Sequence, residues 1–436
     1  MSAPPRFDDA LAAALTWTQR HLQALGGEVH LVRDIFGRVR VLPAVTGASN
    51  ATLATEVDAL LGAWSPGPAS IFLDRAFFTI EELSIDRTLL AEGIWLVDRL
   101  VSEQGWRRPP VASEGHRPRI TFFGLKGGVG RSTALVALAK RLTEQKKRVL
   151  VVDLDLESPG ATSMLLRPEE LPQFGVVDWF VEDGVEQGDD ALLEAMVATS
   201  RVGEVLVAPA LGSRSVPDDD VASLKDGAFI AKLGRAYASP DGADLAVRLD
   251  RLLAGLERVH APDVVLLDSR AGMHDISAAA VPRLGGTVLL FAGATSQTWL
   301  GYRLLFSTWR RDRAALSRFR DRLRVVAAQV PETGREAYLD RLRLHAYDLL
   351  SSFTYEQSDA ADAFTYDVPD PDAPHSPLPI YWRRELVEWE PAAPPGSPAE
   401  TLTPEQFDAA FGPFLRGVLG LPHLADIARD GDEVGP

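Results

Sequence analysis

A glycine-rich loop between an apolar run and a helical pattern constrains this chain more than any other segment. Residues 120–123 read Ile-Thr-Phe-Phe, which is typical of a buried strand, and a helix is expected to open at Ser132. Between them, Gly127, Gly128 and Gly130 let the backbone curl so that its N–H groups converge, where side chains would block a ligand. The helix adds its positive N-terminal end. This order of elements predicts a phosphate-binding loop.

Two side chains at the start of that helix indicate what the loop would bind. Ser132 lies where the Ser or Thr of a phosphate-binding loop holds Mg²⁺. Arg131 stands where such loops carry a lysine that meets the β and γ phosphates of ATP. A guanidinium is planar, larger than an ammonium and prefers bidentate contacts, so the replacement is not conservative. We therefore expect ATP affinity to be retained and turnover to be slow.

The loop belongs to a series of motifs that resembles a known family. Residues 126–132, Lys-Gly-Gly-Val-Gly-Arg-Ser, resemble the deviant Walker A motif of the ParA/MinD family of P-loop ATPases. Residues 149–155 form an apolar run that ends in two carboxylates, as in that family, and residues 264–268 resemble its Walker B strand. Residues 269–272 resemble the loop that senses the γ-phosphate. The resemblance covers roughly residues 119–331.

The resemblance implies ATP and Mg²⁺ as ligands and gives individual residues their roles. Lys126 would reach across a nucleotide-sandwich dimer to the ATP of the partner. Asp155 would position the attacking water, Asp153 would lie near the Mg²⁺ shell, and Asp268 would orient a metal-bound water. Gln329–Glu332 falls where the family contacts adenine. The implied site comprises the catalytic residues Lys126 and Asp155, the nucleotide-binding residues Lys126, Gly127, Gly128, Val129, Gly130, Arg131, Ser132, Thr133, Asp153 and Gly272, and the metal-binding residues Ser132, Asp153 and Asp268.

From Arg119 onward, short apolar runs alternate with helical segments. This pattern predicts an α/β fold with a doubly wound, mostly parallel sheet and helices on both faces. The expected strands are residues 120–123, 149–152, 205–208, 264–267, 288–291 and 323–327. The expected domains are a small N-terminal α/β domain of unknown role (1–106), a linker (107–118), the P-loop ATPase domain (119–390), and a proline-rich segment with a C-terminal helix and an acidic tail (391–436). Residues 369–379 are also proline-rich and are expected to be irregular.

The composition excludes several classes of protein. With 45 basic and 61 acidic residues the formal net charge is −16, which repels nucleic acid and anionic membranes at long range. The chain has no cysteine, which excludes disulfides, thiolate metal sites and cysteine-ligated iron–sulfur clusters. No apolar run approaches the length of a membrane span. We expect a cytoplasmic protein without a membrane partner.

Three functions are compatible with these motifs. The favoured one is an ATPase switch that dimerises with nucleotide and regulates a protein partner through residues 1–106. The second is a DNA-partition ATPase that binds DNA non-specifically through arginines of Arg303–Arg324. The favoured alternative for this stretch is that its aromatic residues pack on the sheet while its arginines are solvated on the outer face. The third is a nucleotide-stabilised scaffold in which Arg131 has reduced catalysis.

Overall fold

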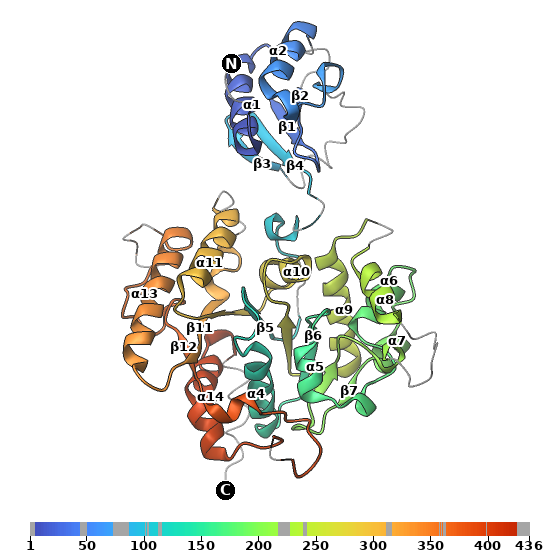
Figure 1. The fold of residues 1–436 in the computed structure, drawn as a ribbon, viewed down its shortest axis with the longest axis vertical. Helices are drawn as coiled ribbons and strands as arrows, with labels where there is room; N and C mark the ends of the chain where they lie inside the picture. Colours follow the sequence, from blue (N-terminus) through green and yellow to red (C-terminus); the bar gives the residue numbers. More distant parts are fainter. Residues whose placement is uncertain are drawn as a thin grey trace. The chain divides into compact units, whose positions relative to one another are not determined.

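The computed structural model consists of two compact units, Met1–Arg108 and Pro109–Pro436 (Figure 1). It describes residues 5–43, 50–72, 87–100, 102, 104–111, 116–216, 227–238, 242–310, 316–356, 358, 360, 363–397 and 399–424. Parts of the expected linker (112–115) and the expected acidic tail (425–436) lie outside these residues. None of the helices in the described part of the chain has the length and apolar character needed to cross a membrane.

The first unit is a small α/β domain. Its elements are α1 (Phe7–His21), β1 (Val29–Arg33), β2 (Val39–Pro43), α2 (Ala51–Leu61), the 3₁₀ turns η1 (Gly62–Trp64) and η2 (Pro68–Ser70), β3 (Arg87–Ala91), β4 (Ile94–Asp98) and η4 (Gln104–Arg107). The four strands form one sheet in the order β2-β1-β4-β3, in which only β1 and β4 are parallel. Buried side chains of α1 and α2, among them Trp17 and Val57, pack with Leu31 and Leu96 of the sheet. The unit therefore has a hydrophobic core of its own.

The second unit contains an eight-stranded sheet in the order β12-β11-β10-β5-β9-β6-β8-β7. Its elements are β5 (Arg119–Gly124), α4 (Arg131–Glu144), β6 (Val149–Leu154), α5 (Gly160–Leu165), η5 (Pro168–Glu170), α6 (Val176–Asp183), α7 (Asp190–Ala195), β7 (Ala198–Thr199), β8 (Leu206–Ala208), η6 (Ser213–Ser215), α8 (Ala228–Ala236), α9 (Leu245–His260), β9 (Val264–Ser269), α10 (Asp275–Arg283), β10 (Thr287–Ala292), α11 (Ser296–Trp309), η7 (Arg320–Arg322), β11 (Leu323–Val330), α13 (Arg335–Phe353), β12 (Leu378–Tyr381), η8 (Arg384–Val387), α14 (Pro404–Leu419) and η9 (Pro422–Leu424). All the strand pairs are parallel except β7 with β8. The expected mostly parallel α/β fold is confirmed.

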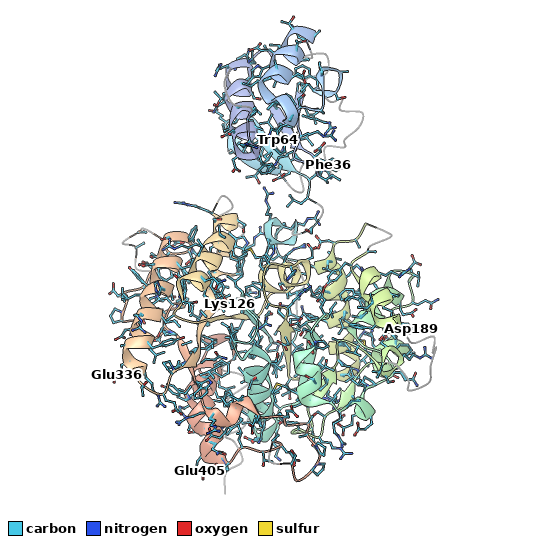
Figure 2. The ribbon with its side chains drawn as sticks, in the orientation of Figure 1. Phe36, Trp64, Lys126, Asp189, Glu336 and Glu405 are labelled. Carbon is cyan, nitrogen blue, oxygen red and sulfur yellow. The ribbon has the colours of Figure 1, made fainter. Side chains whose placement is uncertain are left out.

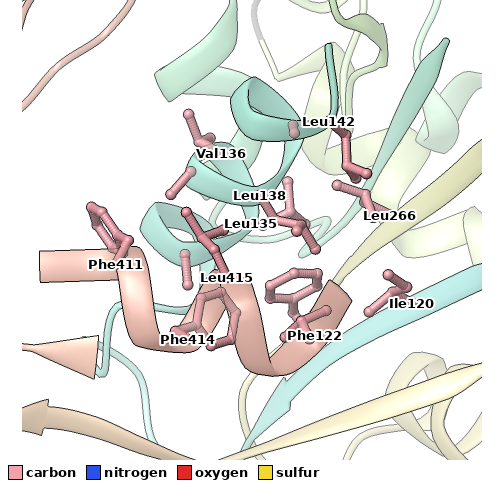
Figure 3. Close-up of a cluster of buried hydrophobic side chains, with 14 of the residues drawn as sticks. Ile120, Phe122, Leu135, Val136, Leu138, Leu142, Leu266, Phe411, Phe414 and Leu415 are labelled. Carbon is pink, nitrogen blue, oxygen red and sulfur yellow. The ribbon is translucent and has the colours of Figure 1, made fainter. Parts of the chain in front are cut away.

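Helices cover both faces of this sheet (Figure 1). Alternate side chains of β5, β6 and β9 point to opposite faces, so each strand contributes to two cores. On one face α4, α5 and α14 pack over Phe122 of β5, and Figure 3 shows Leu135 of α4 and Phe414 of α14 beside it. On the other face α6, α9 and α10 pack on β6 and β9, and Tyr302 of α11 contacts Phe123 of β5. This burial on both faces explains the continuous apolar runs in the sequence.

The outermost strand corrects one expectation. Residues 369–379 were expected to be irregular, but Leu378–Tyr381 forms β12, which pairs in parallel with β11. Pro379 is accommodated because an edge strand leaves one row of N–H positions unpaired. The pairing changes register between Ala327 and Val330, where Gln329 takes a positive φ of 52°. The carboxyl end of β11 is therefore irregular, and it lies at the same edge of the sheet as the glycine-rich loop.

Candidate functional site

The glycine-rich loop presents bare backbone to open space. Gly128 and Gly130 have φ values of 70° and 80°, in the left-handed region that glycine adopts without strain. A Cβ atom added at Gly127, Gly128 or Gly130 would meet no other atom within 4 Å. Helix α4 then begins at Arg131 without a side-chain cap on its first N–H groups. Uncapped N–H groups at a helix start, beside a loop with room for a ligand, suit a phosphate group.

Sheet register brings two of the predicted carboxylates side by side. Asp153 at the end of β6 is the register partner of Asp268 at the end of β9, and both side chains are completely buried. Asp153 accepts hydrogen bonds from the backbone N–H of Asp155 (3.1 Å) and from both the N–H (2.8 Å) and the hydroxyl (2.7 Å) of Thr162. The two hydrogen bonds from Thr162 therefore fix the orientation of the Asp153 carboxylate. Thr162 was not predictable as a site residue, since an isolated threonine in a short helix carries no sequence signal.

Ser132 lies directly against the second carboxylate. Its hydroxyl donates to Oδ2 of Asp268 at 2.6 Å, whereas Oδ1 of Asp268 is buried and has no hydrogen-bond partner among the described residues. Gly160 packs so closely that a Cβ there would lie 2.5 Å from the Ser132 hydroxyl oxygen. A hydroxyl and an unpaired carboxylate oxygen are the oxygen ligands that Mg²⁺ prefers. No group of three or more His, Asp or Glu side chains that could hold a metal ion occurs within the described residues.

Burial gives these acids unusual proton affinities. Burial raises the pKa of Asp268 to about 6, although the Ser132 hydroxyl and the Arg131 guanidinium oppose the shift. Burial, and then the neighbouring Asp268 carboxyl, raise the pKa of Asp153 well above its usual range, against the opposing hydrogen bonds from Thr162 and Asp155. Two acids held together away from water favour a cation between them. A bound cation would lower both pKa values, so these two carboxyls could hold a metal ion.

The Arg131 side chain extends toward the ends of β9 and β6. Its side chain is buried, and Nη1 donates to the backbone carbonyl of Ser269 at 2.6 Å. Its Nη2 lies 3.6 Å from Oδ2 of Asp155. One guanidinium thus joins α4 to the ends of β9 and β6, a span that suits the planar fork of arginine.

Lys126 stands apart from this network. It lies on the loop between β5 and α4 and is half-buried (Figure 2). The other site residues are joined by hydrogen bonds or ion pairs, but within the described ranges no such partner is recorded for the Lys126 ammonium. The structure brings Arg131, Ser132, Asp153, Asp155 and Asp268 together, and leaves Lys126 outside their contacts.

Comparison with known proteins identifies the domain that holds this site. Residues 120–330 match the model of a family described as the CobQ/CobB/MinD/ParA nucleotide binding domain. The chain carries a nucleotide-binding domain of this ParA/MinD family. A search of curated proteins found no match to the sequence.

Several solved structures are similar to the chain at low identity. The ParA protein of pNOB8 is 17% identical with a TM-score of 0.42, covering 72% of this chain and 99% of its own. A ParA family ATPase from Chlorobium tepidum is 14% identical with a TM-score of 0.36, covering 72% and 98%. Cobyrinic acid a,c-diamide synthase from Mycobacterium smegmatis, with bound ADP and magnesium, is 20% identical with a TM-score of 0.34, covering 54% and 96%.

The remaining predicted residues of the ParA/MinD-like domain lie around the loop. Gly272, with a φ of 88°, donates its N–H to the carbonyl of Gly124 at 3.0 Å, which ties the segment after β9 to the start of the loop. Val129 packs against the core and Thr133 is half-buried in the first turn of α4. The side-chain amide of Gln329 donates to the Gly128 carbonyl at 2.8 Å. Gln329, expected near adenine, thus contacts the phosphate loop itself in this structure.

The arginine stretch of the ParA/MinD-like domain is partly internal. Arg324 is buried and donates to the carbonyls of Asp321 and Leu323, and Arg320 pairs with Glu356. Its aromatic residues, Trp299, Tyr302, Phe306, Trp309 and Phe319, are all buried. The packing alternative for these aromatics is therefore confirmed, while Arg311 and Arg313 lie outside the described residues. Arg320 and Arg324, two arginines of the expected DNA-binding surface, therefore already have partners within the domain.

Proposed function

We propose that this protein is an ATP-binding molecular switch that hydrolyses ATP slowly, pairs with a second copy when ATP is bound, and regulates a protein partner. The observation that carries the proposal is the position of Lys126. This cation lies on a loop whose backbone faces open space, and it has no recorded partner among the described residues. An ATP molecule held by a second copy would supply an anionic partner for this ammonium.

The other side chains have complementary roles in the proposed reaction. The backbone of residues 127–133 would hold the phosphates of ATP, and Ser132, Asp153 and Asp268 would hold Mg²⁺. The ion, when bound, would neutralise charge on the phosphates. Asp155 would orient a water for attack on the γ-phosphorus, with ADP as the leaving group.

Slow turnover follows from the contacts of Arg131. Because its guanidinium lies 3.6 Å from Asp155, it stabilises the ionised carboxylate and weakens it as a proton acceptor. Because the same side chain is bonded to the Ser269 carbonyl, moving it toward a phosphate breaks an existing hydrogen bond. Both effects favour binding over rapid hydrolysis.

The N-terminal unit offers a surface for a protein partner. Ile35 and Phe36 are 54% and 68% exposed at the turn between β1 and β2. The turn is fixed because Asp34 accepts hydrogen bonds from the N–H groups of Phe36 (3.0 Å) and Arg38 (2.9 Å). Apolar side chains displayed on a rigid turn favour docking, since little conformational freedom is lost on binding.

The proposal is tested by the solution mass of the protein without nucleotide, with ADP, with ATP and with AMPPNP, while phosphate release is followed in parallel. We expect a monomer that becomes a dimer with ATP or AMPPNP and slow phosphate release. Lys126→Ala should bind ATP but remain a monomer. An unchanged mass with every nucleotide would refute the dimer switch, and an absence of ATP binding at millimolar concentration would refute the whole proposal.

The two alternative functions give different results in the same samples. A scaffold would bind ATP without releasing phosphate. A DNA-partition ATPase would bind DNA only with ATP, with an affinity that falls as salt rises. That test should substitute Arg303 and Arg310, because both are exposed. Arg320 and Arg324 are less suitable, because they already have partners within the domain.

A further inference from the structure

A pocket of about 270 Å³ lies at the amino edge of the large sheet. Strands β5, β10 and β11 are neighbours and run parallel, so their first residues lie at the same edge. Arg119 and Thr287 begin β5 and β10, and Arg322 immediately precedes β11. These three residues line the pocket together with His116. The glycine-rich loop follows the opposite end of β5, roughly 20 Å away along the strand, so the pocket is distinct from the proposed ATP site.

Two residues of this pocket are buried and carry unpaired hydrogen-bonding groups. The Arg119 side chain is fully buried, and its Nε and Nη1 donate to Glu257 and Asp250, each at 2.7 Å, which neutralises its charge. Its Nη2 is nevertheless buried without a hydrogen-bond partner in the described part of the chain, and so is the hydroxyl of Thr287. Because unpaired buried donors are destabilising, an acceptor bound in the pocket would stabilise both groups.

Two further nitrogen-bearing side chains converge on the same pocket. A Cβ added at Gly285 would lie 3.1 Å from Nη1 of Arg322 and 3.1 Å from Nε2 of His116, so both nitrogens approach one point. Nδ1 of His116 lies 2.9 Å from the Arg117 carbonyl and therefore carries a hydrogen, which leaves Nε2 for a ligand. The Arg322 guanidinium has no recorded ion pair or hydrogen bond within the described ranges.

The charge of the pocket is unusual for this chain. The formal net charge is −16, yet none of the described residues that line the pocket is an acid. The nearby acids Asp250 and Glu257 are already paired with Arg119. The positive charge of Arg322 is therefore uncompensated in the pocket, which favours an anionic ligand.

We propose that this pocket binds a phosphate group, either as the free ion or as a phosphomonoester. Polar groups reach it from the segment before β5, from β5 and β10, and from the turn before β11. A carboxylate has only two oxygens for these groups, whereas a phosphate has four and matches the guanidinium fork of Arg322. Nε2 of His116 can accept from a phosphate hydroxyl, or donate when it is protonated. This inference does not depend on the proposed ATP site.

The test titrates inorganic phosphate and glycerol 3-phosphate into the full chain by calorimetry, with AMPPNP and Mg²⁺ in excess to occupy the glycine-rich loop. We expect the wild type to bind at least one of the two, and Arg322→Ala to weaken that binding by about tenfold or more, since a charge-assisted contact is lost. Arg318→Ala is the matched control, because Arg318 is exposed in the same stretch and does not line the pocket. Tighter binding of inorganic phosphate would identify the free ion as the ligand, and tighter binding of glycerol 3-phosphate a phosphomonoester.

A second variant separates binding from folding. Thr287→Val keeps the shape of the side chain and removes its unpaired hydroxyl, so it should raise the melting temperature without phosphate and weaken phosphate binding by about fivefold. Thr121→Val is its control, because the Thr121 hydroxyl is also buried without a partner among the described residues but Thr121 does not line the pocket. It should raise the melting temperature and leave phosphate binding unchanged.

Two results would overturn the inference. One is a wild type that binds neither compound at millimolar concentration, and the other is unchanged binding in both Arg322→Ala and Thr287→Val. Failure of the proposed function would appear separately, as an absence of AMPPNP binding by the wild type.

Discussion

Under the proposed function, the contacts of one side chain, Arg131, set the balance between ATP binding and ATP turnover. Its two contacts, with the Ser269 carbonyl and the Asp155 carboxylate, depend on the width of a guanidinium. A lysine ammonium is a single point charge on a flexible stem and is poorly suited to both contacts at once. The identity of this residue was evident from the sequence. Its direction was not, because direction depends on where β6 and β9 end relative to α4.

We expect Arg131→Lys to raise the rate of phosphate release by about tenfold, because Asp155 loses a fixed cation and becomes a better proton acceptor. The rate is measured at saturating ATP and Mg²⁺. Arg141→Lys, on the same helix but paired with Glu144 at the surface, is the control. A rate that falls in Arg131→Lys would show that the guanidinium assists hydrolysis.

The buried Asp268 predicts a distinctive pH dependence. The pKa of its carboxyl is raised from 3.8 in the unfolded chain to about 6 in the fold, so the folded state binds more protons between those values. Its contribution to stability is therefore present at low pH and is lost as the pH rises from about 4 through about 6. A shift of this size corresponds to roughly 3 kcal/mol.

This dependence is measured by urea unfolding of wild-type protein and Asp268→Asn without nucleotide or Mg²⁺. The unfolding free energy of the wild type should fall relative to that of Asp268→Asn as the pH rises from about 4 through about 6. Adding Mg²⁺ and AMPPNP should make this pH dependence smaller, because a cation favours the ionised carboxylate. A difference that is independent of pH would mean that Asp268 titrates normally.

At the scale of elements, the approach of α5 to α4 controls the geometry of the proposed metal site. Gly160 opens α5, and a Cβ there would lie 2.5 Å from the Ser132 hydroxyl oxygen and 3.6 Å from Oδ2 of Asp268. A contact of 2.5 Å is far below van der Waals distance, so a larger residue must separate the two helices. This contact was not predictable from the sequence, because it depends on how closely α5 packs on α4.

We expect Gly160→Ala to destabilise the protein by about 1–3 kcal/mol and to weaken Mg²⁺-dependent ATP binding by more than tenfold. Thermal unfolding and calorimetric titration measure the two effects. Gly234→Ala in α8 is the matched control, since its Cβ would meet no atom within 4 Å and alanine favours a helix. Normal binding by Gly160→Ala would show that α5 moves freely away from Ser132.

Central strands buried on both faces were predictable from the sequence, and the edge strand was not. The expected strands at 120–123, 149–152 and 264–267 match β5, β6 and β9, because a strand buried on both faces must be apolar throughout. Strand β12 was missed, because an edge strand tolerates proline and needs little apolar surface. For the site, sheet order brings the carboxylates together, whereas Thr162 meets Asp153 through helix packing that no motif encodes.

At the scale of the whole molecule, each unit has its own core, which predicts independent folding. We expect residues 1–108 and 109–436, expressed separately, each to unfold cooperatively, and only the second to bind ATP. Differential scanning calorimetry of the full chain should show one transition that AMPPNP and Mg²⁺ shift upward and one that they leave unchanged. A single transition that shifts as a whole would indicate that the units fold as one cooperative body.

The packing of α14 on α4 has a consequence for protein synthesis. The loop and its helix are made early in the second unit, but the apolar face of α4 is covered by Phe411 and Phe414, which the ribosome adds much later. At about 5–20 residues per second, that delay lasts roughly 15 s to a minute. During it the apolar face of α4 lacks the cover that α14 later provides. The hydrophobic core around α4 is therefore completed only near the end of translation, and a chaperone that shields α4 would act in that interval.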